Sequence, residues 1–255
     1  MNEVNPQKKH YESIHDIYEN SYYDEFSMKY RKKFIYDIFF LGIDFNGCNI
    51  ADIASGSGHN SLYYLNIFPN SKVHGYDISK YACKEYQERV KSEAFECDLT
   101  KPIDISKQYE AVIVVGGLHH CVIDLNTTLK NIAKMVKPGG CLIMYEPNKE
   151  YLLESLRKLW YKKDKYFEQE TEEALSHKDI LEMTQGAFEL YDVKYLGGPA
   201  YFLILNSMIF RIPFKVKRII APSLFFFERI FNKIAFCSIS PIFIARWKRT
   251  DIVVE

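Results

Sequence analysis

The chain has 255 residues, of which 33 are Lys or Arg and 33 are Asp or Glu, so its formal net charge is zero. This length suits one α/β domain with an elaboration, or at most two small domains. A nucleic-acid partner usually requires a basic excess, so the charge balance argues against one. The six cysteines are dispersed without a C-x-x-C pair, which argues against a zinc cluster, and the polar first ten residues lack the apolar core of a signal peptide. Both features favour a cytoplasmic protein with reduced thiols.

Apolar periodicity predicts N-terminal helices followed by strands that alternate with helices. Steps of three and four residues from Phe26 through Tyr30 and Phe34 to Ile38 and Leu41 predict a helix over 24–41, after a first helix over 11–19. The uninterrupted apolar run at 111–115 is typical of a central parallel strand that is covered on both faces. The alternation predicts a doubly wound, mostly parallel α/β sheet. Strands are predicted at 48–53, 72–77, 93–98, 111–115 and 141–146, and helices at 59–68, 79–91, 125–136 and 149–161.

A glycine turn follows the first predicted strand. Gly56 and Gly58 can adopt a positive φ and let the backbone approach a ligand closely. The N–H groups at the start of the next helix would face that ligand. The second strand ends in Asp77, where a carboxylate can accept hydrogen bonds from the two hydroxyls of a ribose. These two signals predict a nucleotide-type cofactor.

Four predicted strands end in residues that suit a ligand. They are Asp52, Asp77, Asp98 and Gly116. In doubly wound sheets, ligands bind beyond the carboxyl ends of the strands. We therefore expect these four strand ends to border one crevice.

The glycine turn alone does not identify the cofactor, because Gly56-x-Gly58-x-x-Ser61 only approximates the dinucleotide fingerprint. Asp52 lies inside the strand end, Asp98 follows the third strand, and Lys137-Pro-Gly-Gly precedes an apolar strand. From about residue 50 to 147 these features resemble the class I S-adenosylmethionine-dependent methyltransferases. That family's motif is commonly D-x-G-x-G-x-G, and Ala54 stands here at its first glycine.

The resemblance implies S-adenosyl-L-methionine as the cofactor and a role for each strand end. Asp77 would bind the ribose, and Asp98 would accept from the adenine amine. Asp52 would hold the glycine loop or meet the methionine ammonium through water. Tyr11, Tyr18, Tyr22 and Tyr23 would be lid aromatics over the cofactor, the alternative being that they pack on the sheet. The expected cofactor-binding residues are Asp52, Ala54, Ser55, Gly56, Gly58, Asp77, Ile78, Cys97, Asp98, Leu99, Gly116 and Tyr22.

Methyl transfer requires mainly that the acceptor be oriented toward the reactive methyl group. An alcohol acceptor also gains from a general base. His119 and His120 follow the turn after the fourth strand, and Glu146 ends the fifth, so these three are the candidate catalytic residues. The alternative for the histidines is packing or ordering of the loop. No metal site is predicted.

The last third of the sequence predicts a helix at 177–185 and strands at 188–196 and 241–247. The resembled family closes its seven-stranded sheet with an antiparallel pair of strands, which makes residues 200–240 a helical insertion before the last strand. This segment is rich in aromatic and basic residues, and Glu228 is its single acid. It can be a substrate cap, a surface that contacts anionic lipid, or a dimer interface.

The chain is therefore predicted to be one methyltransferase domain over 1–255, with a helical lid (1–46), a cofactor-binding core (47–148) and a C-terminal part (149–255) that carries the cap at 200–240. The expected acceptor is a hydroxyl or amine of a small molecule, such as a sugar or a lipid-linked intermediate. The expected location is cytoplasmic, and membrane-associated if the cap meets lipid. Two alternatives remain, namely an NAD-dependent oxidoreductase of Rossmann type and a non-catalytic S-adenosylmethionine-binding partner subunit.

Overall fold

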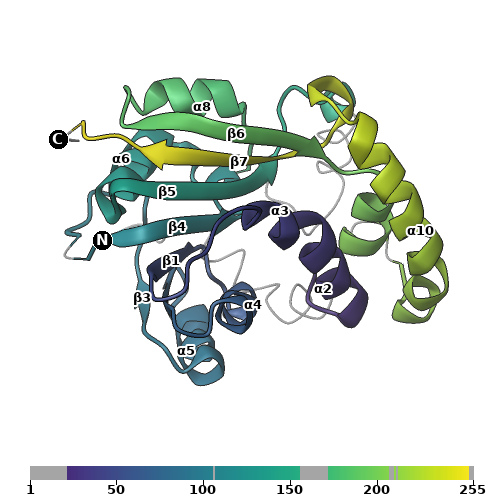
Figure 1. The fold of residues 1–255 in the computed structure, drawn as a ribbon, viewed down its shortest axis with the longest axis horizontal. Coiled ribbons are helices and arrows are strands. Elements are labelled where there is room, and N and C mark those ends of the chain that lie inside the picture. Colours follow the sequence, from purple (N-terminus) through teal and green to yellow (C-terminus); the bar gives the residue numbers. More distant parts are fainter. Residues whose placement is uncertain (1–21, 106, 156–171, 207–209, 211, 253–255) are drawn as a thin grey trace.

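A seven-stranded sheet forms the centre of the computed structural model, which describes residues 22–105, 107–155, 172–206, 210 and 212–252 (Figure 1). The strand order is β3-β2-β1-β4-β5-β7-β6. β1 to β5 are parallel, whereas β7 runs antiparallel to both of its neighbours. The predicted fold class is thus confirmed. The strands are β1 (Asn49–Ile53), β2 (Lys72–Asp77), β3 (Ala94–Glu96), β4 (Tyr109–Val115), β5 (Val136–Pro147), β6 (Phe188–Leu196) and β7 (Ile242–Arg249).

Apolar side chains cover both faces of this sheet, and β4 shows how the sequence produces this arrangement. Successive side chains of a strand point to opposite faces. Ile113 joins the core on the side of the N-terminal helices, whereas Val112 and Val114 join the core on the other side. The helices that follow the strands are α4 (His59–Ile67), α5 (Lys80–Val90), α6 (Leu125–Met135) and α8 (His177–Met183).

The N-terminal helical segment lies within the predicted range 24–41, but its buried face changes part-way. It consists of α2 (Glu25–Arg31), a π-helical turn η1 (Lys32–Tyr36) and α3 (Asp37–Phe39). Asp24 caps α2 by accepting the amides of Phe26 and Ser27. A π-helical turn holds more residues than an α-helical one, so it rotates the residues that follow. Phe39 is buried, whereas Leu41, which the periodicity placed in the core, lies in the turn after α3 and is 57% exposed.

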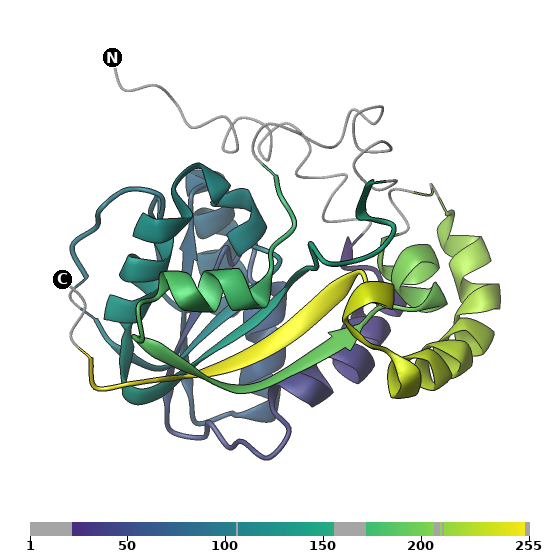
Figure 2. The same cartoon turned by 90° about the horizontal axis from the view of Figure 1, so that it is seen from above.

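The insertion before β7 contains a π-helical turn, η4 (Tyr201–Leu205), and a long helix, α10 (Phe214–Ile234), which lies beside α2 (Figures 1 and 2). Two buried polar contacts join this helix to the rest of the protein. The Lys217 ammonium pairs with the Asp24 carboxylate. Glu228 accepts hydrogen bonds from the Tyr30 hydroxyl at 2.7 Å and from the amides of Gly198 and Ala200 at 2.9 Å each. Among the described helices, none has the length and apolar character needed to cross a bilayer.

The helix predicted at 11–19, with Tyr11 and Tyr18, lies outside the described residues. Of the helix predicted at 149–161, residues 156–161 also lie outside them, and among 149–155 only 154 and 155 are helical. Ser176 caps α8, and His177, the first residue of this helix, is only 4% exposed. Its ring packs near the rings of Tyr195 and Phe243, at 5.9 Å from each. The sequence pattern misses this contact because both partners are distant in the chain.

Removing the buried carboxylate of α10 should destabilise the fold. We expect Glu228→Ala to lower the free energy of unfolding by about 3 kcal/mol, because the Tyr30 hydroxyl and the amides of Gly198, Ala200 and Tyr201 lose their buried acceptor. Urea denaturation followed by circular dichroism measures this loss. The matched control is Glu189→Ala on β6, an exposed acid whose removal should cost less than about 0.5 kcal/mol. Equal effects of the two substitutions would contradict the role of Glu228.

Candidate active site

The loop between β1 and α4 has the conformation that its glycines allow. Gly56 and Gly58 adopt φ values of 52° and 87°. A Cβ atom at Gly58 would lie 2.4 Å from a Val90 methyl carbon, so α5 also requires a glycine here. Ala54, at the position of the family's first glycine, adopts a φ of 51°. This left-handed conformation costs an L-residue about 1 kcal/mol, but it preserves the glycine-type turn.

Asp77, at the end of β2, holds the glycine loop in place. Its carboxylate is buried and accepts the Gly56 amide at 2.9 Å through Oδ2 and the Ser79 amide at 2.9 Å through Oδ1. Ser79 in turn caps α5. A carboxylate has about four acceptor positions, so these two bonds are compatible with further donors from a ligand. Ile78, the next residue, is half-buried. The end of β2 therefore contacts the loop after β1 directly, through the hydrogen bond between Asp77 and the Gly56 amide.

Asp52 is buried beneath the same loop and is only partly hydrogen-bonded. Its Oδ2 atom accepts the Ser61 hydroxyl at 2.6 Å, while Oδ1 has no partner among the described residues. The hydroxyls of Ser55 and Ser57 are also buried without a described partner. Burial raises the pKa of Asp52 to about 7, against the effect of the Ser61 hydrogen bond. Buried polar atoms are rarely left unpaired, so this set fits a ligand that supplies donors and a positive charge.

The turn after β3 is tied to the end of β2. The Cys97 amide donates to the Asp77 carbonyl at 2.9 Å. Asp98 accepts from the amide and hydroxyl of Thr100, at 3.1 and 2.6 Å. The carbonyl of Leu99, a buried residue, accepts the Asn131 amide group at 2.9 Å. Residues 97–99 thus lie in a well-supported turn beside Asp77.

The end of β4 packs against the glycine loop. Gly116 has a φ of 69°, and its amide donates to the Tyr145 carbonyl at 2.8 Å. A Cβ atom at Gly117 would lie 2.6 Å from the Cβ of Ala54. The methyl group of Ala54 therefore occupies space that Gly117 leaves open. The ends of β1, β2 and β4, which were expected to border one crevice, therefore lie side by side.

Glu146, at the end of β5, is fully buried and organises the turn after β4. Its Oε1 atom accepts the amides of Gly117 and Leu118 at 3.0 and 2.8 Å. Its Oε2 atom lies 2.8 Å from Nδ1 of His119, which belongs to the 3-10 turn η2 (Leu118–His120). Burial raises the pKa of Glu146 to about 7, and the amide hydrogen bonds oppose this rise. With Nδ1 as donor to this carboxylate, Nε2 is the nitrogen of His119 that can accept a proton.

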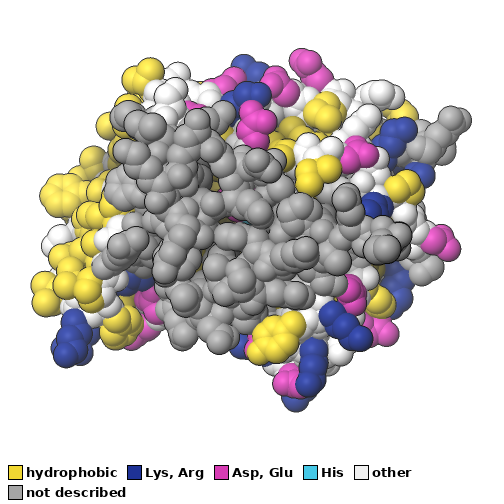
Figure 3. All heavy atoms as spheres, turned by 180° about the vertical axis from the view of Figure 1, so that it is seen from behind, with side chains coloured by type: hydrophobic (Ala, Val, Ile, Leu, Met, Phe, Trp, Pro, Cys, Tyr) yellow, Lys and Arg dark blue, Asp and Glu magenta, His cyan; other side chains and the backbone are white. Residues whose placement is uncertain are grey.

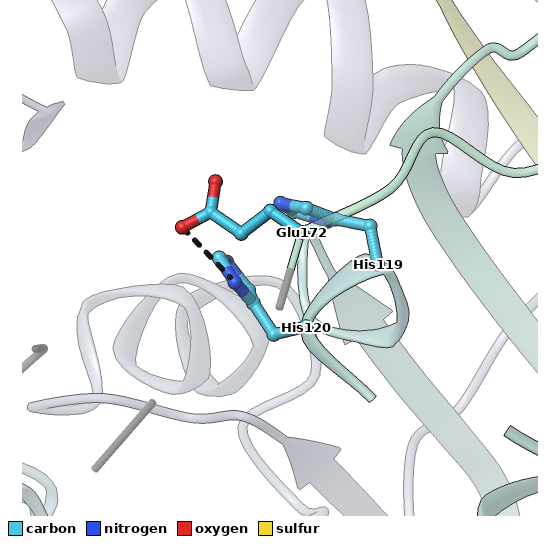
Figure 4. Close-up of side chains that lie close together, drawn as sticks. All are labelled: His119, His120 and Glu172. Atoms are coloured by element: carbon cyan, nitrogen blue, oxygen red, sulfur yellow. Dashed lines mark ion pairs between the residues drawn. The ribbon is translucent and has the colours of Figure 1, made fainter. Parts of the chain in front are cut away.

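Glu172 joins the two histidines from a distant part of the chain (Figure 4). Its carboxylate lies 3.6 Å from Nδ1 of His120, and the His119 and His120 rings are 3.9 Å apart. One ligand atom from each of the three residues lies within 4.8 Å of the others. The three could hold a metal ion only by contracting, because neighbouring ligands of a tetrahedral zinc ion are about 3.3 Å apart. Sequence reasoning missed Glu172, since no motif links it to residues 119 and 120.

The described lid candidates contact the surroundings of the loop. The Tyr22 hydroxyl donates to Asn206 Oδ1 at 3.3 Å, and Tyr22 packs against the core beneath the N-terminal helices. Tyr23 stacks on His59, the first residue of α4, with ring centroids 4.2 Å apart. Tyr23 therefore lies next to the start of the helix that follows the glycine loop, and Tyr22 is partly buried at the edge of the core.

Comparison with known proteins bears on this arrangement. Residues 51–142 match the family model described as a methyltransferase domain. This part of the chain is thus similar to a methyltransferase domain, in line with the resemblance to the class I S-adenosylmethionine-dependent family. Glycine N-methyltransferase of Rattus norvegicus is 30% identical over 143 residues. That match covers 47% of this chain, and the chain spans about half the length, 49%, of this curated relative.

Solved structures share the fold of this chain over most of its length. N-methyltransferase NodS from Bradyrhizobium japonicum WM9, in complex with S-adenosyl-L-homocysteine, has a TM-score of 0.58 and 12% identity, with 94% of this chain and 98% of NodS covered. An O-methyltransferase from a Brevibacillus brevis polyketide multienzyme, also in complex with S-adenosyl-L-homocysteine, has a TM-score of 0.55 and 14% identity, with 84% and 71% covered. At such identities the likeness shows the fold.

The buried Asp52 predicts an unusual pH dependence of stability. Its pKa is about 7 in the folded protein against 3.8 for a free side chain, so folding favours the protonated form. The resulting stabilisation is present below about pH 4 and is lost as the pH rises through about 7. We expect Asp52→Asn to be neutral near pH 4 and to stabilise the ligand-free protein by about 2–4 kcal/mol at pH 8. Urea unfolding at both pH values measures this difference.

The exposed Asp104 offers a matched control for this experiment. Asp104→Asn should change the free energy of unfolding by less than about 0.5 kcal/mol at either pH. The outcome that would contradict this prediction is a stabilisation by Asp52→Asn that does not grow with pH. It would mean that the Asp52 carboxylate is already ionised at low pH and that its charge is compensated in the folded protein.

Proposed function

We propose that the protein binds S-adenosyl-L-methionine at the carboxyl end of the sheet and transfers its methyl group to a hydroxyl or amine of a small molecule. The observation that carries this proposal is the Oδ1 atom of Asp52, which has no partner among the described residues and lies beneath a glycine loop that Asp77 holds. A buried carboxylate with a raised pKa is stabilised by a cation, and the methionine part of this cofactor carries an ammonium group. Asp77 would accept the ribose hydroxyls, and residues 97–99 would border the adenine.

The catalytic part of the proposal concerns His119. S-adenosylmethionine supplies an electrophilic methyl group, so the acceptor's oxygen or nitrogen must give up a proton as it gains that group. We assign the uptake of this proton to Nε2 of His119, since Nδ1 faces Glu146. Glu146 is then a positioning residue that fixes the ring and stabilises its charged form. His120, which lies against His119 and Glu172, would border the acceptor.

Several observations weigh on the alternatives. The methyltransferase family match argues against the NAD-dependent oxidoreductase. The non-catalytic partner subunit was suggested by Ala54, but the loop keeps its turn because Ala54 adopts a glycine-like φ of 51°. We propose a sugar or a lipid-linked intermediate as the first acceptors to test; the lipid-linked class is favoured by the exposed apolar side chains of α10, which suit a lipid surface. Thermal-shift measurements with S-adenosylhomocysteine and with NAD test the choice of cofactor directly. Stabilisation by NAD alone would overturn the proposal.

The first functional prediction concerns cofactor binding. We expect Asp77→Ala to weaken S-adenosylhomocysteine binding by about 1–3 kcal/mol, because the ribose hydroxyls and the Gly56 amide lose their acceptor. Isothermal titration calorimetry measures this change. The control is Glu189→Ala on β6, which should leave the affinity unchanged. Equal affinity of the Asp77 variant and the unmodified protein would refute the role of Asp77.

The second prediction separates binding from chemistry. With an acceptor found by screening hydroxyl and amine compounds for release of S-adenosylhomocysteine, we expect His119→Gln to lower kcat by about 10²–10⁴-fold. Glu146→Gln should also lower kcat, because a carboxamide would present a donor to the His119 ring and favour the wrong tautomer.

Both variants should keep their affinity for S-adenosylhomocysteine within about twofold, because neither residue is assigned to the cofactor. The matched control is His74→Gln on β2, which should retain nearly full kcat. Undiminished turnover by His119→Gln would remove the histidine from the mechanism while leaving cofactor binding intact.

A further inference from the structure

The outward face of α10 exposes an unusual number of large apolar side chains. Ile219 is 77% exposed, and Phe226, Phe227 and Ile230 are each about half exposed. Hydrophobic side chains gather at the edge of the molecule where this helix lies, on the left in Figure 3. The exposed apolar residues of this outward face are Val216, Ile219, Phe226, Phe227, Ile230, Ile234 and, just beyond the helix, Phe236. Exposed groups of this size mark interaction surfaces.

The apolar side chains form one stripe, and a second stripe beside it is basic. Residues three, four or seven positions apart lie on the same side of an α-helix. Ile219, Phe226 and Ile230 therefore share one side, together with Val216 and Ile234. At steps of about 100° per residue, the exposed cations fall on an adjacent side of the same helix. They are Lys215, Arg218, Arg229 and Lys233.

The remaining charges of α10 face inward and fix its orientation. Lys217 is buried and pairs with Asp24. Glu228, the helix's acid, is buried and accepts from the Tyr30 hydroxyl and the amides of Gly198 and Ala200. Because these contacts hold the inner face, the apolar and basic stripes remain at the surface. The exposed face of α10 thus carries cations and no acid.

We propose that this face of α10 binds the surface of a membrane that contains anionic lipids, with the helix lying parallel to that surface. Aromatic and aliphatic side chains can enter the boundary between headgroups and acyl chains, and the neighbouring cations contact anionic headgroups. A helix of 21 residues is about 30 Å long, which lets both stripes reach the same surface. A second copy of the chain is a poorer occupant, because the exposed face of this helix offers the cations no acid to pair with.

Vesicle sedimentation with the full chain tests this inference. The probes are phosphatidylcholine vesicles and vesicles in which about one third of the lipid is phosphatidylglycerol. We expect binding to the anionic vesicles that weakens as salt screens the charges. The double substitutions Arg229→Gln with Lys233→Gln, and Phe226→Ser with Ile230→Ser, should each lower the partition coefficient at least about tenfold. Both pairs are exposed, so neither should disturb the fold.

Matched controls use exposed residues elsewhere. Lys84→Gln with Lys130→Gln, and Leu41→Ser with Tyr81→Ser, should leave vesicle binding unchanged. Absence of binding by the unmodified chain, or equal loss in the controls, would overturn the inference. Light scattering without lipid tests for a dimer. If the unmodified chain is a dimer and the substitutions Phe226→Ser with Ile230→Ser make it a monomer, the occupant of this face is a second copy and the inference is overturned. Vesicle binding requires no methyl transfer, so its failure is distinguishable from failure of the proposed function.

Discussion

Carboxylates at the ends of neighbouring strands fix the loops at the carboxyl end of the sheet. Asp77 ends β2 and accepts the Gly56 amide of the loop that follows β1. Glu146 ends β5 and accepts the Gly117 and Leu118 amides of the turn that follows β4. In both cases the loop after one strand is held by the acid of the next strand in the sheet. The parallel arrangement makes this possible, because it brings all five strand ends to one edge.

These two acids differ from Asp52 in how their charge is compensated. Asp77 and Glu146 accept several backbone amides, which offset part of the cost of burying a carboxylate. Asp52 accepts a single hydroxyl, and its second oxygen has no described partner. An incompletely compensated acid beside a loop of backbone donors raises the free energy of the ligand-free state. A cationic ligand bound there would recover that free energy, so the same feature that lowers stability favours binding.

The sequence predicted the strands, their order along the chain and the meeting of four strand ends, because apolar runs and glycine turns are local signals. The contacts that complete the site were not predicted. Ser61, in the first turn of α4, donates to Asp52, although the sequence indicated it only as part of a glycine pattern, and Glu172 reaches His120 across more than fifty residues. The sequence also placed Glu146 as a candidate base without showing that backbone amides surround it. Such partners depend on tertiary packing, and one sequence contains no pattern for it. For the same reason the π-helical turn η1, and the end of the helix before the exposed Leu41, were not predictable.

The C-terminal insertion uses a buried acid in the same way as the sheet. Glu228 accepts the amides of Gly198, Ala200 and Tyr201 and the Tyr30 hydroxyl, and so connects α10, η4 and α2. A buried carboxylate costs free energy, yet here it fixes the rotation of a helix whose two other sides are apolar and basic. Lys217 pairs with Asp24 on the same inner side, and Leu224 and Phe225 pack there against the core. The two buried charges and this packing together determine which side of α10 remains exposed, and the exposed side determines what the protein can bind.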